Sequence, residues 1–300
     1  MNGAERPEHR ENTLTAAQSP APPHDTLVVA AGGDSVPAPG PPSPARFRRG
    51  LSFLAPLIFL VVISATWEIL VQSDVVNSFL FPAPSAVISA QWSLLGDSAY
   101  WSSLRVTTYE TIVGFLLGTG VGVLLGAAIS MNRFLRRGFH PYVVLFQSLP
   151  KTALAPTFLL WFGFGTASKI VHAAAIAFFP VLINTIAGLD SVNQAPILLM
   201  RSYGASKRQL LAKVSIPHAL PTVMAGVKIA ISLALVGAIV SEFIGAREGI
   251  GFLIHFYSFR FRIDYVFALL ATLAFLGLFL YWVLDVLDRR LIFWRSSRAR

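Results

Sequence analysis

The sequence contains no cysteine among its 300 residues, and this absence excludes a disulfide framework, a thiolate metal site and a thiol nucleophile. Charged residues are scarce as well, at 13% of the chain, whereas about a quarter of the residues in a soluble domain are charged. Apolar residues make up 54% of the chain, and the mean hydropathy is +0.63. Low charge with high hydropathy is typical of a protein that lies in lipid, so we expect an all-α integral membrane protein.

The composition changes near residue 50. Residues 1–49 are rich in proline, alanine, glycine and polar side chains, and we expect a disordered cytoplasmic tail there. We then expect a first transmembrane helix with an extracytoplasmic interfacial segment (50–101), a transmembrane core (102–290) and a basic cytoplasmic tail (291–300). About six stretches approach the roughly 20 residues that cross a bilayer. They are residues 51–71, 108–130, 142–162, 170–189, 220–243 and 265–287.

Two of these stretches have unusual residues. Pro150 and Pro156 interrupt the third, which predicts a broken helix that lines a pathway. The second carries a glycine at every fourth position, at Gly114, Gly118, Gly122 and Gly126. Such a stripe lies near one face of a helix and lets another helix approach closely, so we expect helix packing there.

The positive charges indicate the orientation. A net charge of +9 is compatible with nucleic acid binding or with basic cytoplasmic flanks. If the N-terminus is inside, the cytoplasmic segments hold Arg46, Arg48, Arg49, Arg133, Arg136, Arg137, Arg201, Lys207, Arg208, Lys213, Arg289, Arg290, Arg295, Arg298 and Arg300. The outer segments then hold only Arg105, Lys169, Arg247, Arg260 and Arg262. This bias predicts that both termini are cytoplasmic, and it explains the basic excess without a nucleic acid partner.

The most informative segment is PILLMRSYGASKRQLLAKVSIPHALP, residues 196–221, which we call the coupling loop. Pro196 can open a first helix, and Gly204 can end it. Ser206 and Gln209 form a capping-box pattern for a second helix, which we expect Pro217 to end. We expect Pro221 to fix the entry to the fifth span. The segment is either an amphipathic connector on the membrane surface or a docking knob for a soluble partner.

The coupling loop resembles the EAA loop of binding-protein-dependent ABC permeases. The likeness rests on Gly204-Ala205-Ser206 and on Pro217-His218-Ala219-Leu220-Pro221. At the Glu-Ala-Ala positions this chain has Leu198, Leu199 and Met200, so the resemblance does not extend to the family's acidic contact.

Further motifs are similar to the nitrate/sulfonate/taurine permease group. They are FPAPS from Phe81, LPKTALAP from Leu149, LWFGFG from Leu160, SEFIG from Ser241 and GIG from Gly249. The matches to this group run from about Phe79 to Asp288, and the motifs stand in the family's order.

The resemblance implies a type I ABC importer permease in the plasma membrane, which is not itself an enzyme. Its implied partners are two cytoplasmic ABC ATPases, an extracytoplasmic solute-binding protein and a second permease subunit, in a homodimer. The chain has no G-x-x-x-x-G-K-[ST] loop, so no cofactor is expected and ATP is bound by the partner. The implied solute is a small anion such as nitrate, a sulfonate or taurine. The implied contacts with the ATPase lie in the coupling loop, at Arg201, Gly204, Ala205, Ser206, Lys207, Pro217 and Pro221.

Polar residues within the spans are candidates for the translocation pathway, because an ionisable group in hydrocarbon costs at least about 2.5 kcal/mol. We name Lys151, Pro150, Pro156, Asn184 and Glu242. Lys151 can attract an anion or pack against free carbonyls, and Glu242 can sit at a gate or in a salt bridge. Lys228 is expected to extend toward the cytoplasm, while His172 and Asn184 suit either a lining role or interhelical hydrogen bonds. No group of residues has metal-ligand spacing.

Two other classes of protein compete with the importer. A secondary transporter or channel would need mid-membrane carboxylates that couple to an ion, typically with inverted repeats, and neither is clear in the sequence. An intramembrane enzyme would need a paired catalytic constellation, and the few polar residues in the spans argue against one.

Overall fold

The structure is a computed structural model that describes residues 45–132, 134–135, 138, 142, 145–146 and 148–294. Every regular element in these ranges is helical, which confirms the all-α class. Residues 55–300 form one compact unit, and the contacts discussed below belong to it. The first helix, α1 (Ala45–Gln72), begins before residue 50, so residues 45–49 are helical rather than part of a disordered tail. Residues 1–44, Arg133, Arg136, Arg137 and residues 295–300 lie outside the described part.

Four of the described helices are long and apolar enough to cross a membrane. They are α3 (Ser98–Met131), α6 (Thr166–Asp190), the continuous stretch Lys207–Gly245 that ends in α9 (Ile216–Gly245), and α11 (Ile263–Leu291). The side chains of α1 are described only from Ile58 to Gln72, and this stretch is too short to count among the four. The count of six spans and the cytoplasmic termini therefore stay predictions.

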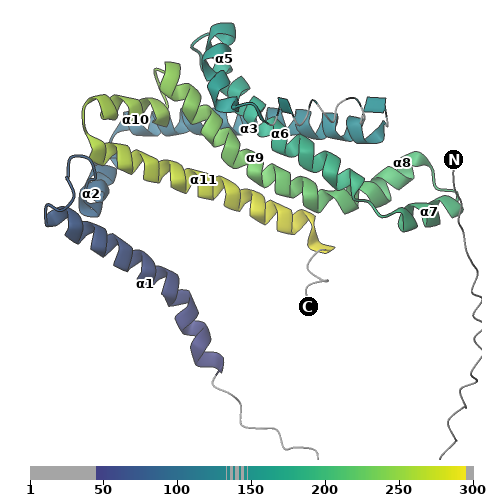
Figure 1. Cartoon of the computed structure of the whole chain (residues 1–300), viewed down its shortest axis with the longest axis horizontal. Coiled ribbons are helices and arrows are strands. Elements are labelled where there is room, and N and C mark those ends of the chain that lie inside the picture. Colours follow the sequence, from purple (N-terminus) through teal and green to yellow (C-terminus); the bar gives the residue numbers. More distant parts are fainter. Residues whose placement is uncertain are drawn as a thin grey trace, which may run out of the picture. The chain divides into compact units, whose positions relative to one another are not determined.

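Helices α3 and α6, both labelled in Figure 1, pack against each other, and the contact is made through the glycine stripe. A Cβ added at Gly114 would lie 2.6 Å from the Cβ of Ala173, and one at Gly126 would lie 2.7 Å from the Cβ of Thr185. At Gly118 it would collide with the carbonyl oxygen of Ala174. The predicted role of the stripe in close helix packing is confirmed.

Small residues also join α6 to α9. A Cβ added at Gly226 of α9 would lie 2.6 Å from the Cβ of Asn184 of α6, and one at Gly237 would lie 2.9 Å from the Cα of Ala173. Ala177 of α6 and Ala234 of α9 are fully buried in the same core. Because α6 touches both α3 and α9 at backbone distance, the three helices form the tightly packed centre of the compact unit.

The predicted third span is broken, as expected. Pro150 precedes the 3-10 turn η1 (Lys151–Leu154), and α5 (Ala155–Phe162) follows. Pro156 stands in the first turn of α5, where its missing N–H costs no helical hydrogen bond. The break is therefore at Pro150, and Pro156 starts a new helix. The first part of this span lies largely outside the described residues.

Two shorter helices lie near the end of the unit opposite the coupling loop (Figure 1). In the segment expected to be interfacial, α2 (Pro84–Leu95) begins within the FPAPS motif, and its Trp92 is exposed. The sequence analysis does not predict α10 (Ile250–Phe259), because at ten residues it is too short to register as a span. It begins after Gly249, whose φ of +116° is one that side chains rarely permit.

Candidate functional site: the coupling loop and the buried polar network

The coupling loop begins with α7 (Gln194–Ser202), and the Asn193 side chain accepts a hydrogen bond from the Ala195 N–H at its start. Gly204 ends this helix with a φ of +75°. Its N–H donates to the Arg201 carbonyl at 2.9 Å, and the Ala205 N–H donates to the Met200 carbonyl at 3.0 Å. This pair of bonds is a Schellman motif, which glycine favours at the left-handed position. The predicted glycine break is confirmed.

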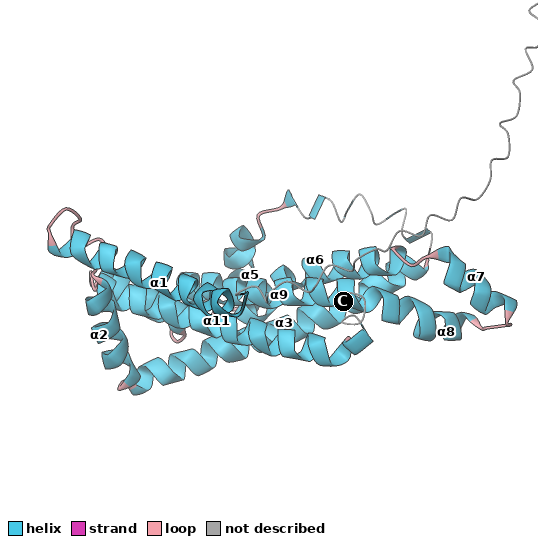
Figure 2. Ribbon diagram, turned by 90° about the horizontal axis from the view of Figure 1, so that it is seen from below, coloured by secondary structure: helices cyan, strands magenta, loops and turns pink. Residues whose placement is uncertain are grey.

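The second helix of the loop, α8 (Lys207–Leu210), starts with the predicted capping box. The Ser206 N–H donates to the Gln209 side chain at 2.8 Å, and the Gln209 N–H donates to the Ser206 hydroxyl at 3.3 Å. Both ends of the turn at Gly204 are thus fixed by hydrogen bonds within the loop. Figure 2 shows α7 and α8 extending past the ends of α6 and α9.

The prediction that Pro217 ends the second helix is wrong, and Pro221 lies inside α9 rather than at its entry. Helix α8 runs through a π-turn, η2 (Leu211–Ser215), directly into α9, with Pro217 in its first turn and Pro221 in its interior. The Ile216 N–H bonds to the Leu211 carbonyl, five residues earlier. The wider π-turn relieves the clash that a proline ring makes with a regular helical turn. The second helix of the loop and the fifth span therefore form one helix.

An ion-pair cluster joins this helix to α11. The Lys228 ammonium lies 2.7 Å from a carboxylate oxygen of Asp285 and 2.6 Å from one of Asp288. Arg289 pairs with Asp285 at 2.7 Å. Lys228 was expected to extend toward the cytoplasm, and its pairing with two aspartates of α11 was not predicted. The signal was present in the sequence, because Asp285 and Asp288 are three residues apart and so share one face of a helix.

A buried polar network lies at the other end of α9. Glu242, which is 1% exposed, accepts hydrogen bonds from the Thr107 hydroxyl at 2.7 Å and from the Gly251 N–H at 2.6 Å. The Thr107 hydroxyl in turn accepts from the Ile250 N–H at 2.8 Å. Glu242 therefore holds the start of α10 against α3 and α9. The bonds from Thr107 and Gly251 to Glu242 thus link α3 and α10 to α9.

Glu110 and Lys169 complete this network, and neither was a candidate in the sequence. The Lys169 ammonium lies 3.3 Å from a Glu110 carboxylate oxygen, and their side chains are 4% and 0% exposed. Glu110 also lies next to Glu242. The cluster thus places two carboxyl groups and one ammonium group inside the protein. Lys169 was assigned to an outer loop by charge counting, but it is buried in the first turn of α6.

His172 makes interhelical hydrogen bonds, one of the two roles considered for it. Its Nδ1 lies 2.6 Å from the Ser241 hydroxyl and 3.1 Å from the Gly237 carbonyl oxygen, both on α9. Its Nε2 lies 3.1 Å from the Lys151 carbonyl oxygen. The imidazole therefore ties the broken third span to α6 and α9.

The pathway candidates are only partly brought together. The Lys151 ammonium lies 5.0 Å from the ring centre of Phe179, on α6. The Asn184 amide donates to the Pro180 carbonyl at 2.8 Å and packs against Gly226, so it bonds within its own helix. Glu242 belongs to the buried network, whereas Pro150 and Pro156 flank η1.

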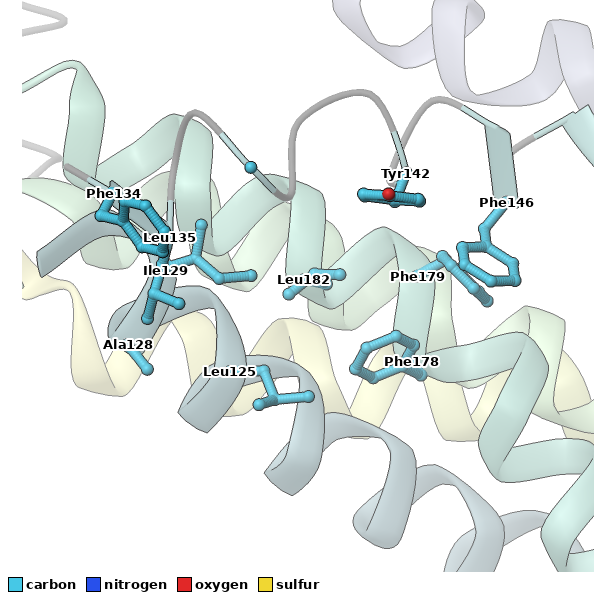
Figure 3. Close-up of a pocket in the computed structure, with 11 residues that line it drawn as sticks. Leu125, Ala128, Ile129, Phe134, Leu135, Tyr142, Phe146, Phe178, Phe179 and Leu182 are labelled. Atoms are coloured by element: carbon cyan, nitrogen blue, oxygen red, sulfur yellow. The ribbon is translucent and has the colours of Figure 1, made fainter. Parts of the chain in front are cut away.

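An apolar cavity of about 850 Å³ lies beside α3 and α6 (Figure 3). Phe178, Phe179 and Tyr142 contribute aromatic rings, and Leu125 and Leu182 contribute aliphatic side chains. Phe179 also makes the contact with Lys151, which is itself not among the residues that line the cavity. Among the described residues no group of histidine, cysteine, aspartate and glutamate could hold a metal ion.

The family profile described as "Binding-protein-dependent transport system inner membrane component" matches residues 118–293. This range contains the coupling loop, α6, α9 with Glu242, and the part of α3 from Gly118 onward. The chain belongs to this family. It is the permease subunit of an ABC importer, a multi-pass protein of the plasma membrane, and the family's members are not enzymes.

Individual relatives agree with the assignment. The permease is 35% identical to a "Probable ABC transporter permease protein" of Haemophilus influenzae, over 81% of this chain and 98% of that one. It is 32% identical to "Formylaminopyrimidine transport permease protein ThiX" of Halalkalibacterium halodurans, over 84% and 100%. It is 30% identical to "Putative aliphatic sulfonates transport permease protein SsuC" of Bacillus subtilis, over 85% of this chain and 91% of that one. The predicted likeness to the sulfonate group is confirmed.

A solved structure supports the fold. The permease superposes with a TM-score of 0.53 on a chain of "Crystal structure of an amino acid ABC transporter with histidines". The two chains are 17% identical, and the match covers 63% of this chain and 92% of that one.

Proposed function

We propose that this permease imports a small solute and that two partner ABC ATPases drive it through the coupling loop. One observation carries the proposal. The helix that starts at Lys207 in the loop runs without a break to Gly245, over 39 residues. A displacement of the loop by a closing ATPase is therefore transmitted along a helix rather than absorbed by a flexible joint.

The packing of α9 determines what moves with it. Because α9 meets α6 at backbone distance and α6 meets α3 in the same way, the three helices move as a unit. The buried Glu242 fastens the start of α10 to the far end of this unit. We infer that ATP-driven movement of the loop tilts the unit between inward-facing and outward-facing states.

We infer that two copies of the permease enclose the pathway between them as a homodimer. An extracytoplasmic binding protein then delivers the solute. The permease itself then holds no nucleotide, and ATP is bound by the ATPase subunits. The cavity beside α3 and α6 lies next to the broken third span and is our candidate for part of the pathway.

For the solute we propose a small organic anion of the sulfonate or taurine type, with Lys151 as the attracting cation. The names of two relatives, which refer to aliphatic sulfonates and to a formylaminopyrimidine, indicate small organic molecules. Replacement of Lys151 by alanine is expected to weaken uptake of the anion. Thermal-shift screening of the partner binding protein against sulfonates, nitrate and pyrimidines identifies the solute independently of the permease.

Substitution of Gly204 tests the docking role of the loop. Gly204→Trp adds bulk at the turn and a side chain at a φ of +75°, so we expect the chain to insert but no longer to copurify with its ATPase. Gly204→Asn is the matched control, because asparagine tolerates this conformation and adds little bulk. Equal copurification of the wild type and Gly204→Trp would refute the docking role.

A further inference from the structure

The outer face of the coupling loop is apolar and basic, and it has no acidic residue. Leu198 and Leu199 are 59% exposed and Tyr203 is 81% exposed, whereas Ile197 and Met200 on the opposite side of α7 are partly covered. Arg201, Lys207 and Arg208 are exposed beside them. Between Ser191 and Ser241 the sequence contains no aspartate or glutamate. The loop therefore carries only positive charge, with three uncovered large apolar side chains.

The length of the helix that follows Gly204 indicates that this face lies outside the lipid. The 39 residues from Lys207 to Gly245 span about 58 Å as a helix, whereas the hydrocarbon core of a bilayer is about 30 Å thick. About half of this helix must extend beyond the hydrocarbon core. Both ribbon views place α7 and α8 past the ends of α6 and α9 (Figures 1 and 2). Exposed leucine and tyrosine side chains in that position need a protein partner to cover them.

We propose that the ATPase groove that receives this loop is acidic at its rim and apolar at its floor, with Leu199 and Tyr203 as the anchoring side chains. This inference rests on the proposed coupling function and states the chemistry of its contact. It differs from the resemblance at one point, since the acidic residue of the family loop is replaced here by Leu198. Buried aromatic and aliphatic anchors supply most of an interface's affinity, while charges outside the centre set its rate and its salt dependence.

The test uses the full-length permease in nanodiscs and the ATPase that copurifies with it. The triple variant Arg201→Glu/Lys207→Glu/Arg208→Glu should weaken binding at least about tenfold at low salt, and the difference should largely disappear near 1 M salt, where charges are screened. The double variant Leu199→Ser/Tyr203→Ser should weaken binding by a similar factor at both salt concentrations, because burial of apolar surface does not depend on screening.

Two substitutions at the end of α11 serve as matched controls. Arg290 and Leu291 are exposed and lie beyond the Lys228–Asp288 ion pair. Arg290→Glu and Leu291→Ser should leave binding unchanged. If charge reversal in the loop leaves binding unchanged or strengthens it, the groove is not acidic. If the serine pair binds as the wild type does, the apolar face packs against lipid instead. Absence of any ATPase from the wild-type preparation would refute the coupling function itself, a result distinct from both.

Discussion

At the scale of single residues, the charge cluster formed by Glu110, Lys169 and Glu242 has a high desolvation cost. These side chains are almost completely buried, and two of the three are acidic. Lys169 is the one described cation that faces this carboxyl pair, and it lies 3.3 Å from Glu110. An ion pair of this kind contributes little over apolar packing, but removal of one partner leaves the other charge buried without compensation.

Replacement of Lys169 by methionine should therefore destabilise the permease by about 3–5 kcal/mol. The double variant Lys169→Met/Glu110→Gln should recover much of this loss, because it removes one of the two carboxylates. Thermal denaturation of detergent-purified protein, followed by size-exclusion chromatography, measures both variants. A single variant as stable as the wild type would show that Lys169 does not compensate the carboxylates.

Local patterns at this scale were predictable and distant pairs were not. The Ser206–Gln209 capping box and the turn at Gly204 involve residues within a few positions of each other, so the sequence contains both partners of each interaction. The pair Glu110–Lys169 joins two helices whose relative register depends on the whole packing arrangement. Charge counting consequently placed Lys169 in an outer loop.

At the scale of elements, the contact between α3 and α6 depends on residues without side chains. Gly118→Ala should destabilise the permease by about 1–3 kcal/mol, because the new methyl group would collide with the Ala174 carbonyl and push the helices apart. Gly120→Ala on the same helix is the control, since no atom lies within 4 Å of its added Cβ. A stability ranking in which Gly120→Ala is the more damaging change would contradict the proposed packing.

The continuous helical connection between α8 and α9 allows a test of whether the loop moves α9. Val214→Gly together with Ser215→Gly should cost the helix about 1–2 kcal/mol and loosen the connection. ATP hydrolysis by the docked ATPase should then continue while solute uptake falls. The matched pair Val214→Ala/Ser215→Ala keeps the helix and should keep uptake. Phosphate release and solute uptake are measured in parallel in proteoliposomes for both double variants. Uptake by the glycine variant at the wild-type ratio to ATP hydrolysis would show that a rigid connection between the loop and α9 is not required.

The wrong prediction that Pro217 ends a helix also concerns an element boundary. A proline in a sequence usually marks the end of a helix, and Pro217 and Pro221 together favoured two boundaries. The structure accommodates Pro217 in the first turn of α9 after the π-turn at 211–215, a device without a sequence signature. The short helix α10 was missed for a different reason, because its ten residues are too few to register as a span.

At the scale of the whole molecule, the compact unit 55–300 carries the coupling loop at one end. The buried network at the other end holds α10 to α3 and α9. The long helix from Lys207 to Gly245 connects them. Fold class and family were predictable because hydropathy and separated motifs are read along the chain, whereas the solute depends on side chains from separate parts of the chain that no local motif identifies.

The central claim is that this chain transports only when a separate protein hydrolyses ATP on its coupling loop. The most direct measurement is uptake of radiolabelled solute into proteoliposomes that contain the purified permease with or without its ATPase and binding protein. We predict uptake only when the permease, the ATPase, the binding protein and ATP are all present, and no uptake when a non-hydrolysable ATP analogue replaces ATP. Uptake by the permease alone, at the rate of the complete system, would contradict the account.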